Sequence, residues 1–96
     1  MPRWYLVTYD ISDPRRWRRV FKHLGRVGTA LQKSVFLCRL THGHCRQLCD
    51  ELARRLDAGS DRLAVVDLGP ATGPNVAALH IIVGPSVRCG PEILIV

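Results

Sequence analysis

Two segments that are apolar on both alternating faces place the strongest constraint on how this chain folds. Residues 4–9 and 35–40 combine β-branched, aromatic and leucine side chains, a pattern typical of strands with neither face in water. A helical pattern follows each segment, and two helices can cover only one face of a sheet. We therefore expect the other face to meet a second copy of the chain or the C-terminal segment.

The two helices have recognisable start signals. Asp13 is a good N-cap and Pro14 suits the first helical position, which predicts a helix from there to about Arg26. Thr41 can cap a second helix over about residues 42–57. The apolar stripe of the first helix consists of Trp17, Val20, Phe21 and Leu24. That of the second consists of Cys45, Leu48, Cys49, Leu52 and Leu56.

Further strands complete the pattern. Residues 29–40 are expected to form two strands joined by a tight turn at their polar centre. After the second helix we expect a loop at 57–61, a strand at 63–68, a flexible connection at 69–74 and short strands at 76–83 and 92–96. The order is β-α-β-β-α-β with one or two extra strands, which predicts an α+β, ferredoxin-like fold.

The length of 96 residues indicates one domain. We expect a single ferredoxin-like domain over 1–96, with a core at 1–68 and a C-terminal strand segment at 69–96. A monomer of this size buries a limited share of its surface, which favours a homodimer.

The charge balance favours a polyanionic partner. Fourteen Lys and Arg residues against eight Asp and Glu residues give a net charge of +6 and an isoelectric point of about 9.8. Such a balance indicates nucleic acid before a membrane. No run approaches the ~18 apolar residues of a membrane span, and the first residues lack the apolar region of a signal peptide. We therefore expect a cytoplasmic protein, without membrane contact, whose cysteines are reduced.

Asp10 is the first candidate for chemistry. It directly follows an apolar strand, at the carboxyl end where open sheets tend to place ligand sites. A carboxylate there can hold Mg²⁺ (or Mn²⁺) together with water and substrate phosphate. The alternative is that Asp10 caps the loop before the first helix, because Asp is common in turns. Asp13 is interpreted as the helix cap rather than as a second metal ligand.

A basic run covers the first predicted helix. It consists of Arg15, Arg16, Arg18 and Arg19. The helix N-terminus and the guanidinium groups together can bind phosphate, and the alternative is a solvated outer face. The strand aromatics, Tyr9 and Phe36 among them, lie at core spacing, so they indicate core or interface packing rather than base stacking.

The second predicted helix carries four potential metal ligands: His42, His44, Cys45 and Cys49. The two cysteines also fall on its apolar stripe, where free Cys behaves as a small hydrophobe. Their spacing differs from the usual zinc patterns, and no second pair is placed to complete four ligands. The pattern favours packing over zinc binding and leaves the role of these residues open.

Several short motifs occur together along the first two thirds of the chain. They are Tyr9-Asp10-Ile11 closing the first strand, the Arg-rich first helix, Gln32-x-Ser34-Val35-Phe36, Thr41 before a Leu-patterned helix, and Asp61-x-Leu63. In combination and at this spacing, they resemble the CRISPR-associated protein 2 family. The resemblance covers residues 1 to about 68 closely and the tail loosely.

The resemblance implies a ferredoxin-like homodimer whose sheets pack face to face, with the last strand reaching the neighbouring subunit's sheet. It implies a role in CRISPR adaptation (spacer acquisition), in which the dimer bridges the integrase partner and holds the DNA to be inserted. Several members of the family are Mg²⁺-dependent endonucleases on single-stranded RNA or duplex DNA. By this resemblance, Asp10 from both subunits flanks the metal as the catalytic residue, and Tyr9 and Phe36 lie near that site.

Two other functions compete with the nuclease. A non-catalytic scaffold uses the same dimer and basic helix to hold DNA, with Asp10 as a turn residue, and the sequence leaves it open. An RNA-recognition module shares the order of strands and helices, but its strand motif needs glycine and further aromatics. Residues 34–40 contain no glycine and only one aromatic, Phe36, so we reject that module.

Overall fold

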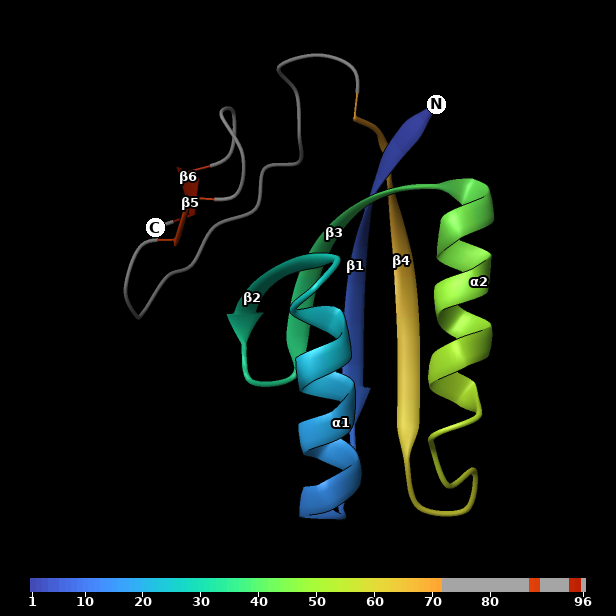
Figure 1. The fold of residues 1–96 in the computed structure, drawn as a ribbon. Helices are drawn as coiled ribbons and strands as arrows, with labels where there is room; N and C mark the ends of the chain where they lie inside the picture. The colour runs from blue at the N-terminus through green and yellow to red at the C-terminus, as the bar shows by residue number, and fades with distance from the viewer. Residues whose placement is uncertain (72–86, 89–93, 96) are drawn as a thin grey trace.

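A computed structural model describes residues 1–71, 87–88 and 94–95 of the chain (Figure 1). The main elements are β1 (Pro2–Asp10), α1 (Pro14–Leu24), β2 (Gly28–Gln32), β3 (Val35–Thr41), α2 (His42–Ala53) and β4 (Arg62–Pro70). The four strands form one antiparallel sheet in the order β2-β3-β1-β4. This arrangement confirms the predicted α+β, ferredoxin-like fold.

Two short strands follow near the C-terminus. β5 (Val87–Arg88) and β6 (Leu94–Ile95) pair with each other in a separate antiparallel sheet. β6 lies within the strand predicted at 92–96, while the strand predicted at 76–83 lies outside the described residues.

The end of β4 differs from the prediction. A flexible connection was expected from residue 69, but β4 continues to Pro70, and the N–H of Ala71 donates to the carbonyl oxygen of Pro2 at 3.0 Å. Gly69 permits this continuation, because it adopts a φ of +104° beside an irregularity in the pairing of β1 with β4. A side chain at that position would strain the backbone.

Side-chain caps begin both helices as predicted. Asp13 Oδ2 accepts a hydrogen bond from the N–H of Arg16 at 2.9 Å, and Pro14 occupies the first turn of α1. Thr41 Oγ1 accepts one from the N–H of His44 at 3.1 Å. These caps satisfy donors that no helical carbonyl reaches.

The end of α2 at Ala53 corrects the predicted end at residue 57. The N–H groups of Arg55 and Leu56 donate to carbonyl oxygens three residues back, which tightens the chain into turns that do not continue the helix. The N–H of Asp57 is then bound by the carboxylate of Asp61 at 2.9 Å. Leu56 still packs against the core, which explains why the apolar stripe continued beyond the helix.

α1 ends at Leu24, two residues before the predicted end at Arg26, and Gly25 caps it.

After α1, strands β2 and β3 approach each other closely. At Gly28, a Cβ atom would lie 2.5 Å from the Sγ of Cys38 and 2.7 Å from the carbonyl oxygen of Leu37. Only glycine allows β2 to run this close to β3.

The core lies between both helices and one face of the sheet (Figure 1). Val7 and Phe36 oppose each other across β1 and β3 and are 0% and 1% exposed. They pack with the apolar stripes of α1 and α2, through residues such as Leu24 and Leu52. Phe21 adds an edge-to-face contact with Phe36, the ring centroids being 5.2 Å apart.

The opposite face of the sheet is apolar too, and neither α1 nor α2 covers it. In the strand register Leu6 faces Leu37 on β3 and Val66 on β4, so these three side chains share that face. Leu37 is buried, whereas Val66 is 47% exposed. The partner expected on this open face stays a prediction.

Within the described residues, no helix combines the length and the apolar character that crossing a membrane requires.

Candidate functional site

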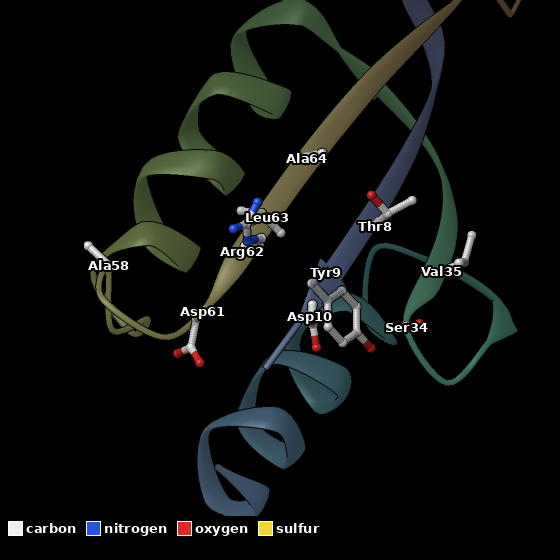
Figure 2. A pocket seen from close by; sticks show the side chains of 10 residues that line it. All are labelled: Thr8, Tyr9, Asp10, Ser34, Val35, Ala58, Asp61, Arg62, Leu63 and Ala64. Carbon is white, nitrogen blue, oxygen red and sulfur yellow. The ribbon is translucent and has the colours of Figure 1, made fainter. Parts of the chain in front are cut away.

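A pocket opens at the carboxyl end of β1 (Figure 2). Its volume is about 700 Å³. Its walls come from the end of β1, the start of β3, the loop after α2 and the start of β4; the lining residues are Thr8, Tyr9, Asp10, Ser34, Val35, Ala58, Asp61, Arg62, Leu63 and Ala64. Three stretches that are far apart in sequence, 8–10, 34–35 and 58–64, therefore meet beside Asp10.

Asp10 offers an uncommitted carboxylate in this pocket. Its side chain is exposed and, within the described part of the chain, has no hydrogen-bond or ion-pair partner. Capping of α1 is done by Asp13 instead. Arg62 faces Asp10 across the β1–β4 pair and is also exposed. An exposed carboxylate beside an arginine is a suitable place for a cation and a phosphate to meet.

Alternation along β1 directs Asp10 toward the open face. Successive strand side chains point to opposite sides, so Leu6, Thr8 and Asp10 share one side and Val7 and Tyr9 the other. The carboxylate therefore belongs to the same surface as the apolar residues left uncovered by the helices.

Asp61 lines the same pocket but is fully engaged by its own chain. Its side chain has 0% exposure, and it accepts hydrogen bonds from Arg16 Nε at 2.7 Å and Arg16 Nη2 at 3.2 Å. It also accepts from the N–H groups of Asp57 at 2.9 Å and Ser12 at 3.3 Å. The Arg16 guanidinium, with these backbone donors, lowers the pKa of Asp61 to about 2.

This network fixes the loop that follows Asp10. Asp61 ties together the residues after β1, the first turn of α1 and the loop before β4. Asp57 also supports this network, because its carboxylate accepts a hydrogen bond from the hydroxyl of Ser60 at 2.6 Å. The pKa of Asp57 is lowered, first by this hydroxyl. The rim of the pocket is therefore braced by charge-assisted hydrogen bonds.

The arginines predicted to bind nucleic acid have different environments. Arg16 is half-buried and directs its Nε and Nη2 groups to Asp61 and Ser60. Arg15, Arg18 and Arg19 are exposed on the outer side of α1. Only these three present whole guanidinium groups to a ligand.

The two aromatics predicted near the site are core residues. Tyr9 is 5% exposed, and its hydroxyl donates to the carbonyl oxygen of Lys33 at 2.7 Å. Burial raises the pKa of Tyr9 to about 12, which keeps the phenol neutral. Phe36 lies beneath it, with the ring centroids 6.4 Å apart, and does not line the pocket. Tyr9 thus shapes the pocket wall by holding the turn between β2 and β3.

The histidines and cysteines of α2 lie apart from this pocket. Cys45 is buried with the apolar stripe, and burial raises the pKa of its thiol to about 11. Cys49 is half-buried, while His42 and His44 are exposed. Among the described residues, no three or more His, Cys, Asp or Glu side chains form a group suited to holding a metal ion.

Asp61 was absent from the predicted site residues. Its sequence position gives a signal, since it is a carboxylate between a polar loop and an apolar strand. That signal indicates a turn, however, and its pairing with Arg16, 45 positions away, depends on the tertiary fold.

Comparison with known proteins agrees with this fold. The family model described as CRISPR associated protein Cas2 matches residues 1–72. A protein of Rhodospirillum rubrum named CRISPR-associated endoribonuclease Cas2 1 is 42% identical over 73 residues, covering 76% of this chain and 72% of the relative. CRISPR-associated endoribonuclease Cas2 of Geobacter sulfurreducens is 36% identical over 90 residues, covering 92% of this chain and 95% of the relative.

Solved structures show the same similarity. A hypothetical protein from Thermus thermophilus superposes with a TM-score of 0.74 at 29% identity, covering 93% of this chain and 99% of that one. Streptococcus pyogenes Cas2 gives a TM-score of 0.62 at 29% identity, covering 66% and 82%. The resemblance found in the sequence motifs is confirmed: the chain belongs to the CRISPR-associated protein Cas2 family.

Proposed function

We propose that this protein is a metal-dependent endonuclease of CRISPR adaptation, acting as a homodimer with Asp10 as its catalytic, metal-binding residue. The observation that carries the proposal is the carboxylate of Asp10, which has no partner among the described residues, in a pocket where Asp61 is already engaged. The names of the two relatives as endoribonucleases support nuclease activity.

The donor set fits Mg²⁺ or Mn²⁺ best when two chains contribute. Asp61 is surrounded by donors of its own chain, which leaves Asp10 as the free carboxylate of the pocket. Mg²⁺ commonly takes one or two carboxylates and completes its shell with water and phosphate oxygens. Two copies of Asp10 would meet that requirement. When bound, the cation would polarise a phosphoryl oxygen and lower the pKa of a water ligand.

The open face explains how two copies of Asp10 can meet. Asp10 lies at the end of the surface that carries Leu6 and the exposed Val66. Burying this apolar face against its own copy would generate a two-fold interface, in which the same residues lie on both sides. With the two-fold axis near the Asp10 end of β1, face-to-face packing of the sheets would bring the two pockets toward each other.

Arginines around the pocket would position the nucleic acid. Arg62 lies beside Asp10 in the pocket wall, and Arg15, Arg18 and Arg19 extend the positive surface along α1. Guanidinium groups hold phosphates in fixed orientation without reading sequence. Arg16 contributes indirectly, by fixing Asp61 and the loop after β1.

Membership of the family supports a proposal for the cellular role. We propose that the dimer takes part in spacer acquisition, bridges the integrase partner and holds DNA. A non-catalytic scaffold is the second candidate, and one observation favours it: among the described residues, a single chain supplies one free carboxylate to the pocket.

Replacing Asp10 with Asn separates the two functions. Asn has nearly the same shape, and the Asp10 side chain makes no hydrogen bond or ion pair in the described chain that its loss would break, so folding should be kept. With Mg²⁺ or Mn²⁺, we expect cleavage of RNA or duplex DNA to fall to background. Binding measured in EDTA should not change, because no metal is then present in either protein.

Asp50→Asn is the matched control. Asp50 is exposed on α2, away from the pocket, and the substitution removes the same charge. Its cleavage rate should equal that of the parent protein. A parent protein that cleaves nothing with either metal would overturn the nuclease and leave the scaffold. Equal loss of cleavage in both variants would refute the assignment of Asp10.

A further inference from the structure

A pocket of about 300 Å³ lies between α2 and the neighbouring strands β1 and β4 (Figure 1). Its lining includes Tyr5 of β1, Cys45 and Cys49 of α2, and Val65 of β4. None of these four residues lines the Asp10 pocket. This second pocket, here called the thiol pocket, therefore holds two thiols and a phenol that the proposed nuclease does not use.

The two thiols are neighbours on one face of the helix. Cys45 and Cys49 are four residues apart within α2, a spacing that brings the Cβ atoms to about 5–6 Å from each other. Both are free cysteines. Cys45 is buried and Cys49 is half-buried, so a small ligand can reach the pair past Cys49. Two sulfur atoms therefore line the same small space.

Cys45 carries a proton before any ligand binds. Burial first, and then the neighbouring Cys49, raises the pKa of the Cys45 thiol to about 11. A neutral thiol is a weak hydrogen-bond acceptor, whereas a charged acceptor forms stronger hydrogen bonds. A soft cation can replace the proton, because the thiolate is the form of cysteine that binds metals. The sulfur of Cys45 would then become a strong acceptor.

The Tyr5 hydroxyl is the donor that this change would satisfy. Tyr5 is 3% exposed, and its Oη atom has no hydrogen-bond partner within the described residues. A buried polar atom without a partner lowers stability, so its presence calls for a physical reason. Burial raises the pKa of Tyr5, and the nearby Cys45 raises it further. The phenol thus lies beside the thiol whose ionisation would give it an acceptor.

Two sulfur ligands without a third group select the kind of cation. Over the described part of the chain, no three His, Cys, Asp or Glu side chains form a group suited to a metal ion, so the four ligands of a structural zinc site are not assembled there. Soft thiolates favour Cu(I), which is stable with two sulfur ligands. A water molecule could also satisfy the Tyr5 hydroxyl, but it would not explain why two thiols lie beside it.

We propose that Cys45 and Cys49 bind a soft monovalent cation, Cu(I), and that the Tyr5 hydroxyl donates a hydrogen bond to the sulfur of Cys45. Each thiol releases its proton to solvent as its sulfur binds the cation, and no electron is transferred. Two thiolates and one Cu(I) carry one net negative charge. The exposed guanidinium of Arg46, which also lines the thiol pocket, can compensate it.

Competition for Cu(I) tests the thiol pair. The protein competes with the chromophoric chelator bicinchoninate, without oxygen, nucleic acid or Mg²⁺. The parent protein should take up one Cu(I) per chain, and Cys45→Ala/Cys49→Ala should take up none. The matched control, Cys38→Ala/Cys89→Ala, also removes two thiols and should keep the uptake of the parent. Cys38 does not line the thiol pocket, and Cys89 lies outside the described residues.

Single variants keep this comparison valid if a double variant fails to fold. Cys38 is a core residue, so circular dichroism must first show that the control has the helix content of the parent. If it does not, Cys49→Ala is compared with Cys89→Ala. Cys49 is half-buried, so its truncation is the mildest change to the pair. Uptake should be lost in Cys49→Ala and kept in Cys89→Ala.

Tyr5→Phe tests the hydroxyl. Its affinity for Cu(I) should be about 10- to 100-fold lower than that of the parent, as is typical when a metal ligand loses its hydrogen-bond partner. Tyr9→Phe is the matched control, because the Tyr9 hydroxyl donates to Lys33 and lies outside the thiol pocket. It should bind Cu(I) with the affinity of the parent. Equal affinity in Tyr5→Phe and the parent would refute the role of the hydroxyl.

Three results would overturn the site itself. They are a parent protein that leaves all Cu(I) with the chelator, equal uptake by folded Cys45→Ala/Cys49→Ala and its folded control, and displacement of bound Cu(I) by an equal concentration of Zn²⁺. Cu(I) uptake involves neither Asp10 nor nucleic acid. Its failure would therefore leave the proposed nuclease unaffected, and loss of cleavage would leave the thiol pocket unaffected.

Discussion

Two regions meet at the same pocket and use an aspartate in opposite ways. At the end of β1, Asp10 is exposed and has no partner within the described chain. In the turn before β4, Asp61 is buried and accepts hydrogen bonds from Arg16, Asp57 and Ser12. The difference indicates that Asp10, which contributes no hydrogen bond or ion pair to the described fold, is the carboxylate available to a ligand. The engaged one stabilises the surroundings.

The open face offers the strongest test of the role given to the free aspartate. Val66→Asp places a charge where the proposed homodimer buries an apolar side chain, so the dimer dissociation constant should rise by about 10- to 100-fold. Cleavage should fall with the dimer, because Asp10 would lose its copy. Sedimentation and cleavage rates over a range of protein concentrations measure both effects.

Ala53→Asp is the control for this variant. It adds the same charge to an exposed position of α2. It should leave the dimer and the cleavage rate as they are. Cleavage by a Val66→Asp monomer at the parent rate would show that one Asp10 is enough.

Asp61→Asn should lower stability far more than Asp10→Asn. An amide at position 61 removes the charge that Arg16 binds and turns an NH₂ group toward existing donors. We expect the midpoint of thermal unfolding to fall by roughly 10 °C. Asp10→Asn should shift it by less than about 2 °C. Circular dichroism on both variants measures the contrast, and equal shifts would refute it.

The pH dependence of stability tests how firmly Asp61 is held by its partners. Arg16 and the backbone donors hold the pKa of Asp61 at about 2, below its ordinary value of 3.8. The stabilisation from this lowered pKa is complete above about pH 4 and is lost as the pH falls through 2. Unfolding midpoints measured between pH 5 and pH 2 should fall more steeply in the parent protein than in Asp61→Asn. Parallel curves would contradict the lowered pKa of Asp61.

Much of the fold was predictable because its signals are local. The caps Asp13 and Thr41 and the apolar stripes depend on neighbouring residues, and they set both helix starts correctly. The end of α2 was missed because the turn at Leu56 depends on hydrogen bonds near the Asp61 network. The continuation of β4 was missed because it depends on pairing with β1 at Gly69.

The site was less predictable for the same physical reason. Asp10 could be proposed because a carboxylate after an apolar strand is a local pattern, and its role stays a prediction. The role of Arg16 could not, since an arginine on a basic helix looks identical whether it faces solvent or a carboxylate from residue 61. Long-range pairing of charges leaves no periodic trace in a single sequence.

The smallest predicted effect of a substitution concerns Tyr9, which holds the wall of the pocket. Tyr9→Phe removes the hydrogen bond to the carbonyl oxygen of Lys33, which should lower the free energy of unfolding by about 1 kcal/mol. Tyr5→Phe is the matched control, because the Tyr5 hydroxyl is buried with no hydrogen-bond partner in the described chain. Its removal should be neutral or stabilising. Urea unfolding measures the free energy of unfolding of both variants. A larger decrease in Tyr5→Phe than in Tyr9→Phe would contradict the stabilising role of the Tyr9 hydroxyl.

The close contact of β2 with β3 at Gly28 has a consequence for inheritance. Every single-nucleotide change of a glycine codon that substitutes another residue introduces a Cβ atom, and at Gly28 that atom would lie 2.5 Å from the Sγ of Cys38. The backbone carbonyl of Leu37, at 2.7 Å, closes the other direction. A smaller residue at position 38 would relieve only the first of these contacts, because the backbone carbonyl of residue 37 is present whatever side chain follows it. No one-step substitution at this codon can therefore be neutral, and the codon should keep glycine even where position 38 changes.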